Sequence, residues 1–290
     1  MPAAWPVAWV QLSSALPIPA THANKAATCH PHRPAGKVLV NDQPVLKAGH
    51  QVSGAARVDI IAEQPKYVCR AGLKLERALA HFAIDVAGKT ALDSGLSTGG
   101  FTDCLLQHGA AAVVGVDVGY GQVAERIRTD PRVTVMERTN LRHLRRAGLP
   151  DGAPVDLITL DVSFISLLKL LDAVCDLLAP AGELLLLIKP QFEAGKAQVG
   201  AGGVVRDPAV HAEVIQRVVV AYEAAGFECQ GWRESPIKGA TSGNTEFLAY
   251  FKRRRRPDSA GKGLGEAAAV AAEARADEGL TPGSHEAGEG

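Results

Sequence analysis

Four charged residues stand where an enzyme built on a β-sheet would hold reactive groups. Asp161 and Lys189 each follow an apolar run with a strand pattern, Lys74 begins a helical pattern, and Glu246 precedes the last strand. The carboxyl ends of parallel strands converge on one crevice, and an antiparallel last strand would bring its start to the same edge. We therefore expect two lysines and two carboxylates on one rim. The ordinary alternative for each residue taken singly is a solvated strand end.

A glycine-rich segment after another apolar strand could hold a small cofactor. It runs from Asp93 to Phe101 as Asp-Ser-Gly-Leu-Ser-Thr-Gly-Gly-Phe and opens a helix. Glycine permits sharp turns and close approach to a ligand, and a helix start offers free N–H groups with a partial positive charge. The next strand ends in Asp117, whose carboxylate could hold a ribose diol. These features fit NAD as well as S-adenosylmethionine.

The first residue of this segment favours S-adenosylmethionine. Asp93 at the strand end would repel a pyrophosphate, whereas it would attract a cationic sulfonium and an ammonium. The glycines at 95, 99 and 100 also miss the GxGxxG spacing of dinucleotide enzymes. A turn without a ligand is the remaining alternative. We predict an S-adenosylmethionine site formed by Asp93, Gly95, Ser97, Thr98, Gly99, Gly100, Phe101, Asp117 and Asp161.

Apolar strands alternate with helices from about residue 67 to residue 252. The patterns predict strands at 90–93, 112–116, 133–136, 155–160, 183–188, 227–232 and 247–251, and helices at 74–82, 99–108, 166–178 and 208–225. Such alternation is typical of a parallel sheet covered on both faces. The last two strands are joined by a loop without a helix. We expect an α/β fold, a Rossmann-like class I methyltransferase, with a mostly parallel seven-stranded sheet, helices on both faces and one antiparallel strand.

Composition limits the other possibilities. The 290 residues carry 31 Lys+Arg and 31 Asp+Glu, so any RNA contact must come from local patches and not from a global basic field. The five cysteines are scattered without a CxxC pair, which argues against a disulfide framework and against a zinc site, and we expect no metal. No apolar run approaches the ~18–20 residues of a membrane span.

The flanking regions differ from this core. Residues 1–36 contain several prolines and no Asp or Glu, which is consistent with a disordered leader or an organellar transit peptide. Residues 37–62 show short β-type alternation, and residues 253–290, rich in Ala, Gly and Glu, are expected to form a disordered tail. The chain would accordingly be cytoplasmic, or plastid or mitochondrial if the leader is a transit peptide.

Six segments closely resemble the hemolysin A (TlyA) family, which belongs to the FtsJ-like RNA 2′-O-methyltransferases: residues 70–75, 93–101, 116–122, 137–140, 161–166 and 189–195. The resemblance covers about residues 37–252. It implies methylation of cytidine ribose in ribosomal RNA, with ribosomal RNA or a ribosomal subunit as partner. It also implies a catalytic Lys-Asp-Lys-Glu tetrad, which falls on Lys74, Asp161, Lys189 and Glu246.

The chemistry of the implied reaction accounts for such a tetrad. A ribose 2′-hydroxyl is a poor nucleophile because its alkoxide is strongly basic. A neutral lysine, or one held against the oxygen as the proton leaves, can activate the hydroxyl, and we assign this role to Lys189 as a hypothesis. Asp161 would lie nearest the sulfonium and orient Lys189. Glu246 and Lys74 would fix the ribose and balance charge.

Residues beside the tetrad could contact RNA. Phe164 and Phe192 follow the two catalytic strands and could stack on a flipped-out base, with core packing as an equal alternative. Lys196 and Arg206 could contact phosphates. The basic run at 252–256 could do the same, although a solvated chain end is the simpler interpretation.

The sequence departs from the family at its N-terminal side. The family carries an N-terminal S4 RNA-binding module, whose latter half is recognisable in residues 36–41 and 46–49. The basic helices that should precede it have no counterpart in the proline-rich stretch, so we expect a truncated S4-like segment at 37–62. Leu96 also stands in the cofactor loop where the family usually has a small residue.

Three other functions compete with an rRNA ribose methyltransferase. A methyltransferase acting on another acceptor has no general need for Lys189 and Glu246. A non-catalytic RNA-binding or ribosome assembly factor would not need an intact loop at Asp93 and all four tetrad positions. A pore-forming haemolysin, which the family name suggests, would need amphipathic or membrane-spanning segments, and the sequence has none.

Overall fold

The computed structural model describes residues 38–45, 53, 56–60, 65–239 and 243–254. The predicted leader, with its transit-peptide interpretation, and nearly all of the predicted tail lie outside the described residues. The chain divides into two compact units, Met1–Pro65 and Lys66–Gly290.

The first unit contains a small antiparallel sheet with the order β2-β1-β3. Its strands are β1 (Val38–Val40), β2 (Gln43–Val45) and β3 (Val58–Ile60). Asn41 and Asp42 have positive φ angles of 48° and 65°, which suit the tight turn between β1 and β2. The predicted strand and the Asn-Asp turn are thus present, and the assignment to an S4-like segment remains a prediction.

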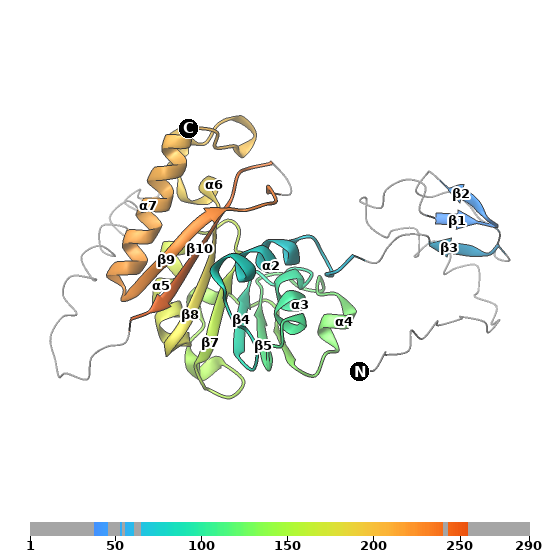
Figure 1. Cartoon of the computed structure of the whole chain (residues 1–290), viewed down its shortest axis with the longest axis horizontal. Helices are drawn as coiled ribbons and strands as arrows, with labels where there is room; N and C mark the ends of the chain where they lie inside the picture. Colours follow the sequence, from blue (N-terminus) through green and yellow to red (C-terminus); the bar gives the residue numbers. More distant parts are fainter. Residues whose placement is uncertain (1–37, 46–52, 54–55, 61–64, 240–242, 255–290) are drawn as a thin grey trace, which may run out of the picture. The chain divides into compact units, whose positions relative to one another are not determined.

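The second unit is built on a seven-stranded sheet (Figure 1) with the order β6-β5-β4-β7-β8-β10-β9. Its strands are β4 (Thr90–Ser94), β5 (Ala112–Val116), β6 (Val133–Met136), β7 (Val155–Leu160), β8 (Leu178–Ile188), β9 (Phe227–Glu234) and β10 (Phe247–Arg253). Of these seven strands, β10 runs in the opposite direction to the other six, and it is therefore antiparallel to both neighbours, β8 and β9. The predicted fold class, including its single antiparallel strand and its final hairpin, is confirmed.

Helices cover both faces of this sheet because successive strand residues point to opposite sides. On one face, residues such as Ala91 and Leu157 pack with α2 (Ala71–Phe82) and α3 (Gly100–Gln107). On the other face, residues such as Leu92 and Ile158 pack with α5 (Leu171–Leu177) and α7 (Pro208–Ala224). Both faces are apolar, which explains the continuous hydrophobic runs of the central strands.

Some boundaries differ from the sequence-based predictions. The helix predicted at 166–178 is a 3₁₀ turn, η3 (Leu167–Leu170), followed by the shorter α5. Strand β8 begins at Leu178 because Leu178 pairs with Val155, and a register irregularity follows where Pro180 and Gly182 lie. The four-residue helices α4 (Glu125–Arg128) and α6 (Pro190–Glu193) were not predicted, because one turn shows no hydrophobic period.

The order of the strands reverses at one point in the sheet, which marks the edge where a ligand site is expected. Strand β5 lies on one side of β4 and β7 lies on the other, so the chain reverses its direction of progress at β4. In open α/β sheets, ligands bind outside the carboxyl ends of the strands at such a switch point. The residues that follow β4, β5, β7 and β8 are therefore placed to form a site.

Candidate active site

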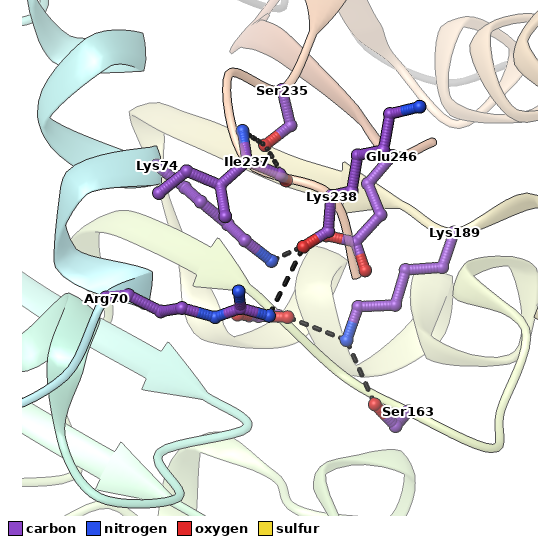
Figure 2. A network of polar contacts seen from close by, with 9 residues as sticks. Arg70, Lys74, Ser163, Lys189, Ser235, Ile237, Lys238 and Glu246 are labelled. Atoms are coloured by element: carbon purple, nitrogen blue, oxygen red, sulfur yellow. Dashed lines mark hydrogen bonds and ion pairs between the residues drawn. The ribbon is translucent and has the colours of Figure 1, made fainter. Parts of the chain in front are cut away.

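Two buried ion pairs form the centre of the site (Figure 2). Lys74 Nζ lies 2.5 Å from Glu246 Oε2, and Lys189 Nζ lies 2.7 Å from Asp161 Oδ1. Lys74, Lys189 and Glu246 are each less than a tenth exposed. Charges this deeply buried are tolerated when each has an opposite partner. The tetrad thus forms two compensated pairs and not four independent surface charges.

The strand register brings the tetrad together. Phe247 of β10 pairs with Ile188 of β8, so the adjoining Glu246 and Lys189 lie at neighbouring strand ends. Leu160 of β7 pairs with Leu186 of β8, which places Asp161 at the same edge. Lys74 reaches this edge from the first turn of α2, which begins three residues earlier than its apolar pattern predicted.

Two polar residues that sequence reasoning did not single out lie beside the pairs. Lys189 Nζ donates a hydrogen bond to Ser163 Oγ at 2.9 Å, so its ammonium is held from two sides. Arg70 Nη2 donates to the carbonyl oxygen of Lys238 at 3.4 Å, which ties the start of α2 to the loop before Glu246. The sequence did offer one indication of these two residues, since Ser163 and Arg70 lie inside the segments at 161–166 and 70–75 that resemble the TlyA family.

The cofactor loop turns sharply between β4 and α3. Gly95 and Gly99 have φ angles of 87° and 96°, and Ser97 has a φ of 49°. A Cβ at Gly95 would come within 2.3 Å of the backbone oxygen of Asp161. Glycine is therefore required at position 95 for two reasons: the backbone conformation is left-handed, and the Asp161 backbone after β7 comes too close to allow a side chain.

Asp117 lies at the end of β5, where a ribose diol was predicted to bind. Its Oδ2 accepts from Ser97 N and its Oδ1 accepts from Gly119 N, both at 2.7 Å. These bonds fix the carboxylate between the cofactor loop and the loop after β5, and the residue stays partly exposed. The carboxylate oxygens have further lone pairs that could accept from hydroxyl groups.

Asp93 lies beneath the loop and is fully buried. Its carboxylate accepts from Thr102 Oγ1 at 2.7 Å and from Thr159 Oγ1 at 3.0 Å, which braces β4 against α3 and β7. Burial raises the pKa of Asp93 to about 6, and the charge of Asp161 adds to the rise while the threonine bonds oppose it. Asp93 and Asp161 thus create a negative potential at this edge, which suits a cationic ligand.

Three other residues predicted to bind the cofactor support the loop by packing. Gly100 packs against Cys69, because a Cβ there would lie 2.4 Å from the sulfur. Phe101 is buried in the core beneath α3. The Thr98 carbonyl oxygen accepts from Ala124 N at 3.1 Å. Direct contact of these three with the cofactor remains a prediction. Leu96 is buried and fills the space above Gly115.

An exposed aromatic side chain lies on the loop that carries Asp161 and Ser163. Phe164 is 91% exposed, and its backbone has a φ of 65°, which is unfavourable for a bulky residue. Its ring lies 5.1 Å from that of the partly buried Phe192, centroid to centroid. Core packing therefore does not explain Phe164. Lys196 and Arg206 are both exposed, between β8 and α7.

A family comparison agrees with this site. The model for the FtsJ-like methyltransferases matches residues 67–253. The chain belongs to the FtsJ-like methyltransferase family. This membership excludes the NAD alternative for the glycine loop. The cofactor is S-adenosylmethionine, and the enzyme is a methyltransferase.

Three relatives extend the comparison to most of the chain. "Putative rRNA methyltransferase YqxC" of Bacillus subtilis is 46% identical over 217 residues, which cover 75% of this chain and 76% of that protein. "16S/23S rRNA (cytidine-2′-O)-methyltransferase TlyA" of Mycobacterium tuberculosis is 42% identical over 234 residues, covering 80% and 86%. A solved structure titled "Putative hemolysin" from Streptococcus thermophilus is 37% identical, with a TM-score of 0.66 over 83% of this chain and 87% of that one.

Two structural findings concern the metal and membrane alternatives. Within the part of the chain that the structure describes, His, Cys, Asp and Glu form no group of three or more that could hold a metal ion. None of the described helices is long and apolar enough to cross a membrane.

Proposed function

We propose that this methyltransferase transfers a methyl group to the 2′-oxygen of cytidine ribose in ribosomal RNA, presented as RNA or as a ribosomal subunit. One observation carries the proposal: two buried lysine–carboxylate pairs meet at the edge of the sheet where the cofactor loop ends. The name of the TlyA relative, at 42% identity, supports this acceptor.

The reaction is an in-line displacement. S-adenosylmethionine supplies a methyl group on a cationic sulfur. The 2′-oxygen attacks the methyl carbon, the oxygen–carbon bond forms, and the sulfur–carbon bond breaks to leave a neutral thioether. In the proposed step Lys189 first releases one proton to solvent, its neutral Nζ amine then takes the hydroxyl proton, and Asp161 pairs with the ammonium that is formed again. Because the protein forms no covalent bond to the substrate, positioning contributes much of the rate.

The second pair holds the ribose. Lys74 Nζ and Glu246 Oε2 lie 2.5 Å apart and supply donors and an acceptor at the rim. Gly239 lets the backbone come close to this carboxylate, because a Cβ there would lie 3.0 Å from Glu246 Oε1. We assign to Glu246 and Lys74 the fixing of the ribose hydroxyls and the balancing of charge.

Phe164 provides a surface for the base. A nucleotide inside a helix must leave its stack before its ribose can enter a crevice. Exposed aromatic rings recover part of the lost stacking, typically about 1–3 kcal/mol per base. The strained backbone at Phe164, of a kind that costs about 1–3 kcal/mol, holds such an exposed ring on the loop that carries Asp161 and Ser163. Phe192 supports it, and Lys196 and Arg206 are assigned to phosphates.

The N-terminal unit adds RNA contacts in this proposal. We assign residues 37–62 to a partial S4-like segment and residues 67–252 to the catalytic domain. The three-stranded sheet β2-β1-β3 of the N-terminal unit is consistent with the latter half of an S4 module.

Substitution of Lys189 tests the proposed chemistry. Lys189→Ala should bind S-adenosylmethionine within about threefold of the wild type, yet transfer methyl groups to ribosomal subunits at least ~100-fold more slowly, because the proton acceptor is gone. The measurements are calorimetric binding and transfer of labelled methyl groups to subunits from cells whose gene for this chain is deleted. Arg77→Ala, which removes an exposed cation from α2, is the control. Near-normal turnover of Lys189→Ala would rule out this role, and methylation of another acceptor alone would rule out the substrate.

A further inference from the structure

The loop between β7 and η3 carries several groups of the proposed site on a strained backbone. Asp161, Ser163 and Phe164 lie within it, and Phe164 has a positive φ of 65°. An aromatic residue keeps such a conformation only where the surrounding structure fixes both ends of the segment. The first end is fixed by the sheet, because Asp161 N donates to Ser94 O at 2.9 Å.

The second end of the loop is held by Glu193 of α6. Glu193 Oε2 accepts from Ser166 Oγ and Glu193 Oε1 accepts from Leu167 N, both at 2.7 Å. The residue is 8% exposed, and its burial raises the pKa of the carboxyl. A carboxylate is costly to bury unless its oxygens are used. Here the two oxygens hold two adjacent residues directly after the strained segment.

Helix α7 secures this attachment from behind. Tyr222 Oη donates to the Leu167 carbonyl oxygen at 2.9 Å, and Arg217 Nη2 donates to the Glu193 carbonyl oxygen. Helix α6 packs against α7, and Lys189 is the residue that immediately precedes α6. Lys189 therefore leads directly into the short helix whose Glu193 holds the loop with Phe164.

We propose that Glu193 is a positioning residue that holds the loop from Asp161 to Ser166 in its strained conformation, and so keeps Phe164 and Ser163 aligned with Lys189. The proposal rests on the proposed function of that site. Glu193 touches neither acceptor nor cofactor, and acts through Ser166 and Leu167. Its loss should therefore change turnover on RNA and leave cofactor affinity intact, because Asp161, the one residue of this loop assigned to the cofactor, is anchored separately by its N–H to Ser94 O, and Gly95 and Asp117 belong to other loops.

Two substitutions at the same position separate the contacts from the fold. Glu193→Ala removes both hydrogen bonds. In Glu193→Gln, Oε1 can still accept from Leu167 N while Nε2 donates to Ser166 Oγ. The substrate is ribosomal subunits from cells whose gene for this chain is deleted. We expect the kcat of Glu193→Ala to fall at least ~10-fold and the kcat of Glu193→Gln to stay within ~3-fold of the wild type. S-adenosylmethionine affinity should stay within ~2-fold in both, as in the control Glu228→Gln on β9.

A double-mutant cycle with Phe164→Ala shows whether Glu193 acts through the loop. If it does, adding Glu193→Ala to Phe164→Ala should lower kcat much less than Glu193→Ala does in the wild type. Losses that multiply would overturn the proposal, as would equal losses in Glu193→Gln and Glu193→Ala, or a parallel loss of cofactor affinity.

One further variant covers a failure to fold. If circular dichroism shows that Glu193→Ala does not fold, Ser166→Ala is tested in its place, because it removes one of the two hydrogen bonds. A several-fold fall in the kcat of Ser166→Ala at unchanged cofactor affinity supports the proposal. An unchanged kcat overturns it. A wild type that transfers no methyl group to subunits would instead refute the proposed function. An active wild type with undiminished Glu193→Ala turnover would refute this inference only.

Discussion

At the scale of single residues, Asp93 is a carboxylate whose surroundings differ from those that its position in the sequence suggested. It was predicted from its place at the strand end, because a carboxylate there attracts a sulfonium. The structure buries it completely, with Thr102 and Thr159 as donors. We infer that Asp93 braces the loop and, when ionised, adds negative potential beneath it together with Asp161.

The raised pKa of Asp93 predicts a dependence of stability on pH. Its pKa rises from 3.8 in the unfolded chain to about 6 in the folded protein. Between these values the folded state binds more protons, so the free energy of unfolding should fall as the pH rises from about 4 to about 7, by about 3 kcal/mol from this group.

The variant Asp93→Asn removes this titration. Its stability relative to the wild type should increase by about 3 kcal/mol over the same pH range, as measured by urea unfolding at several pH values. The comparison cancels the effects of the other carboxyl groups, which both proteins share. A stability difference that does not change with pH would contradict the assigned pKa and its origin in burial.

The residues that carry charge were easier to predict than those that hold them. Lys74, Asp161, Lys189 and Glu246 stood at the ends of predicted elements, so the convergence of strand ends indicated a shared rim. Ser163, Thr102, Thr159 and Glu193 gave no such signal, because serine, threonine and glutamate are common in many settings. Their roles depend on contacts between residues far apart in the chain.

At the scale of elements, the loop between β4 and α3 should be the least tolerant of added bulk. Gly95→Ala requires a side chain at a φ of 87° and places its Cβ within 2.3 Å of the Asp161 backbone oxygen. We expect a loss of more than ~2 kcal/mol of stability and at least a tenfold loss of S-adenosylmethionine affinity. Denaturant unfolding and calorimetric titration would measure the two effects.

A matched glycine separates strain from collision. Gly152 also has a positive φ, of 60°, but a Cβ at this position would meet nothing within 4 Å. Gly152→Ala should therefore cost only about 1 kcal/mol and leave cofactor binding unchanged. Equal losses in the two variants would show that the approach of Asp161 to the loop has no special importance.

The sequence predicted most elements because their apolar patterns were clear. The predicted bounds of β5, β6 and β7 agree with the structure, since each is a short run made mostly of apolar residues. The boundary between α5 and β8 was placed wrongly, because Leu178 pairs with Val155 of β7 and so starts the strand five residues before Glu183, where the regular pairing begins. Pairing of this kind depends on a strand that is distant in the sequence, so it cannot be predicted from local strand propensity.

At the scale of the whole molecule, the two units should be separable for cofactor binding. Lys66–Gly290 forms one compact unit that contains every residue assigned to the cofactor. A fragment of residues 66–290 should unfold cooperatively and bind S-adenosylmethionine within about twofold of the full chain, with weaker affinity for ribosomal subunits. Calorimetry and filter binding would measure these quantities, and a fragment with lost cofactor affinity would contradict this division of labour.

The central claim concerns the atom that receives the methyl group. The most direct measurement incubates separate small and large ribosomal subunits from deleted-strain cells with the enzyme and labelled S-adenosylmethionine, digests the RNA to nucleosides, and identifies the labelled product by mass spectrometry. The account predicts 2′-O-methylcytidine, formed by the wild type and not by Lys189→Ala. Label on a base, or no label in either subunit, would contradict it.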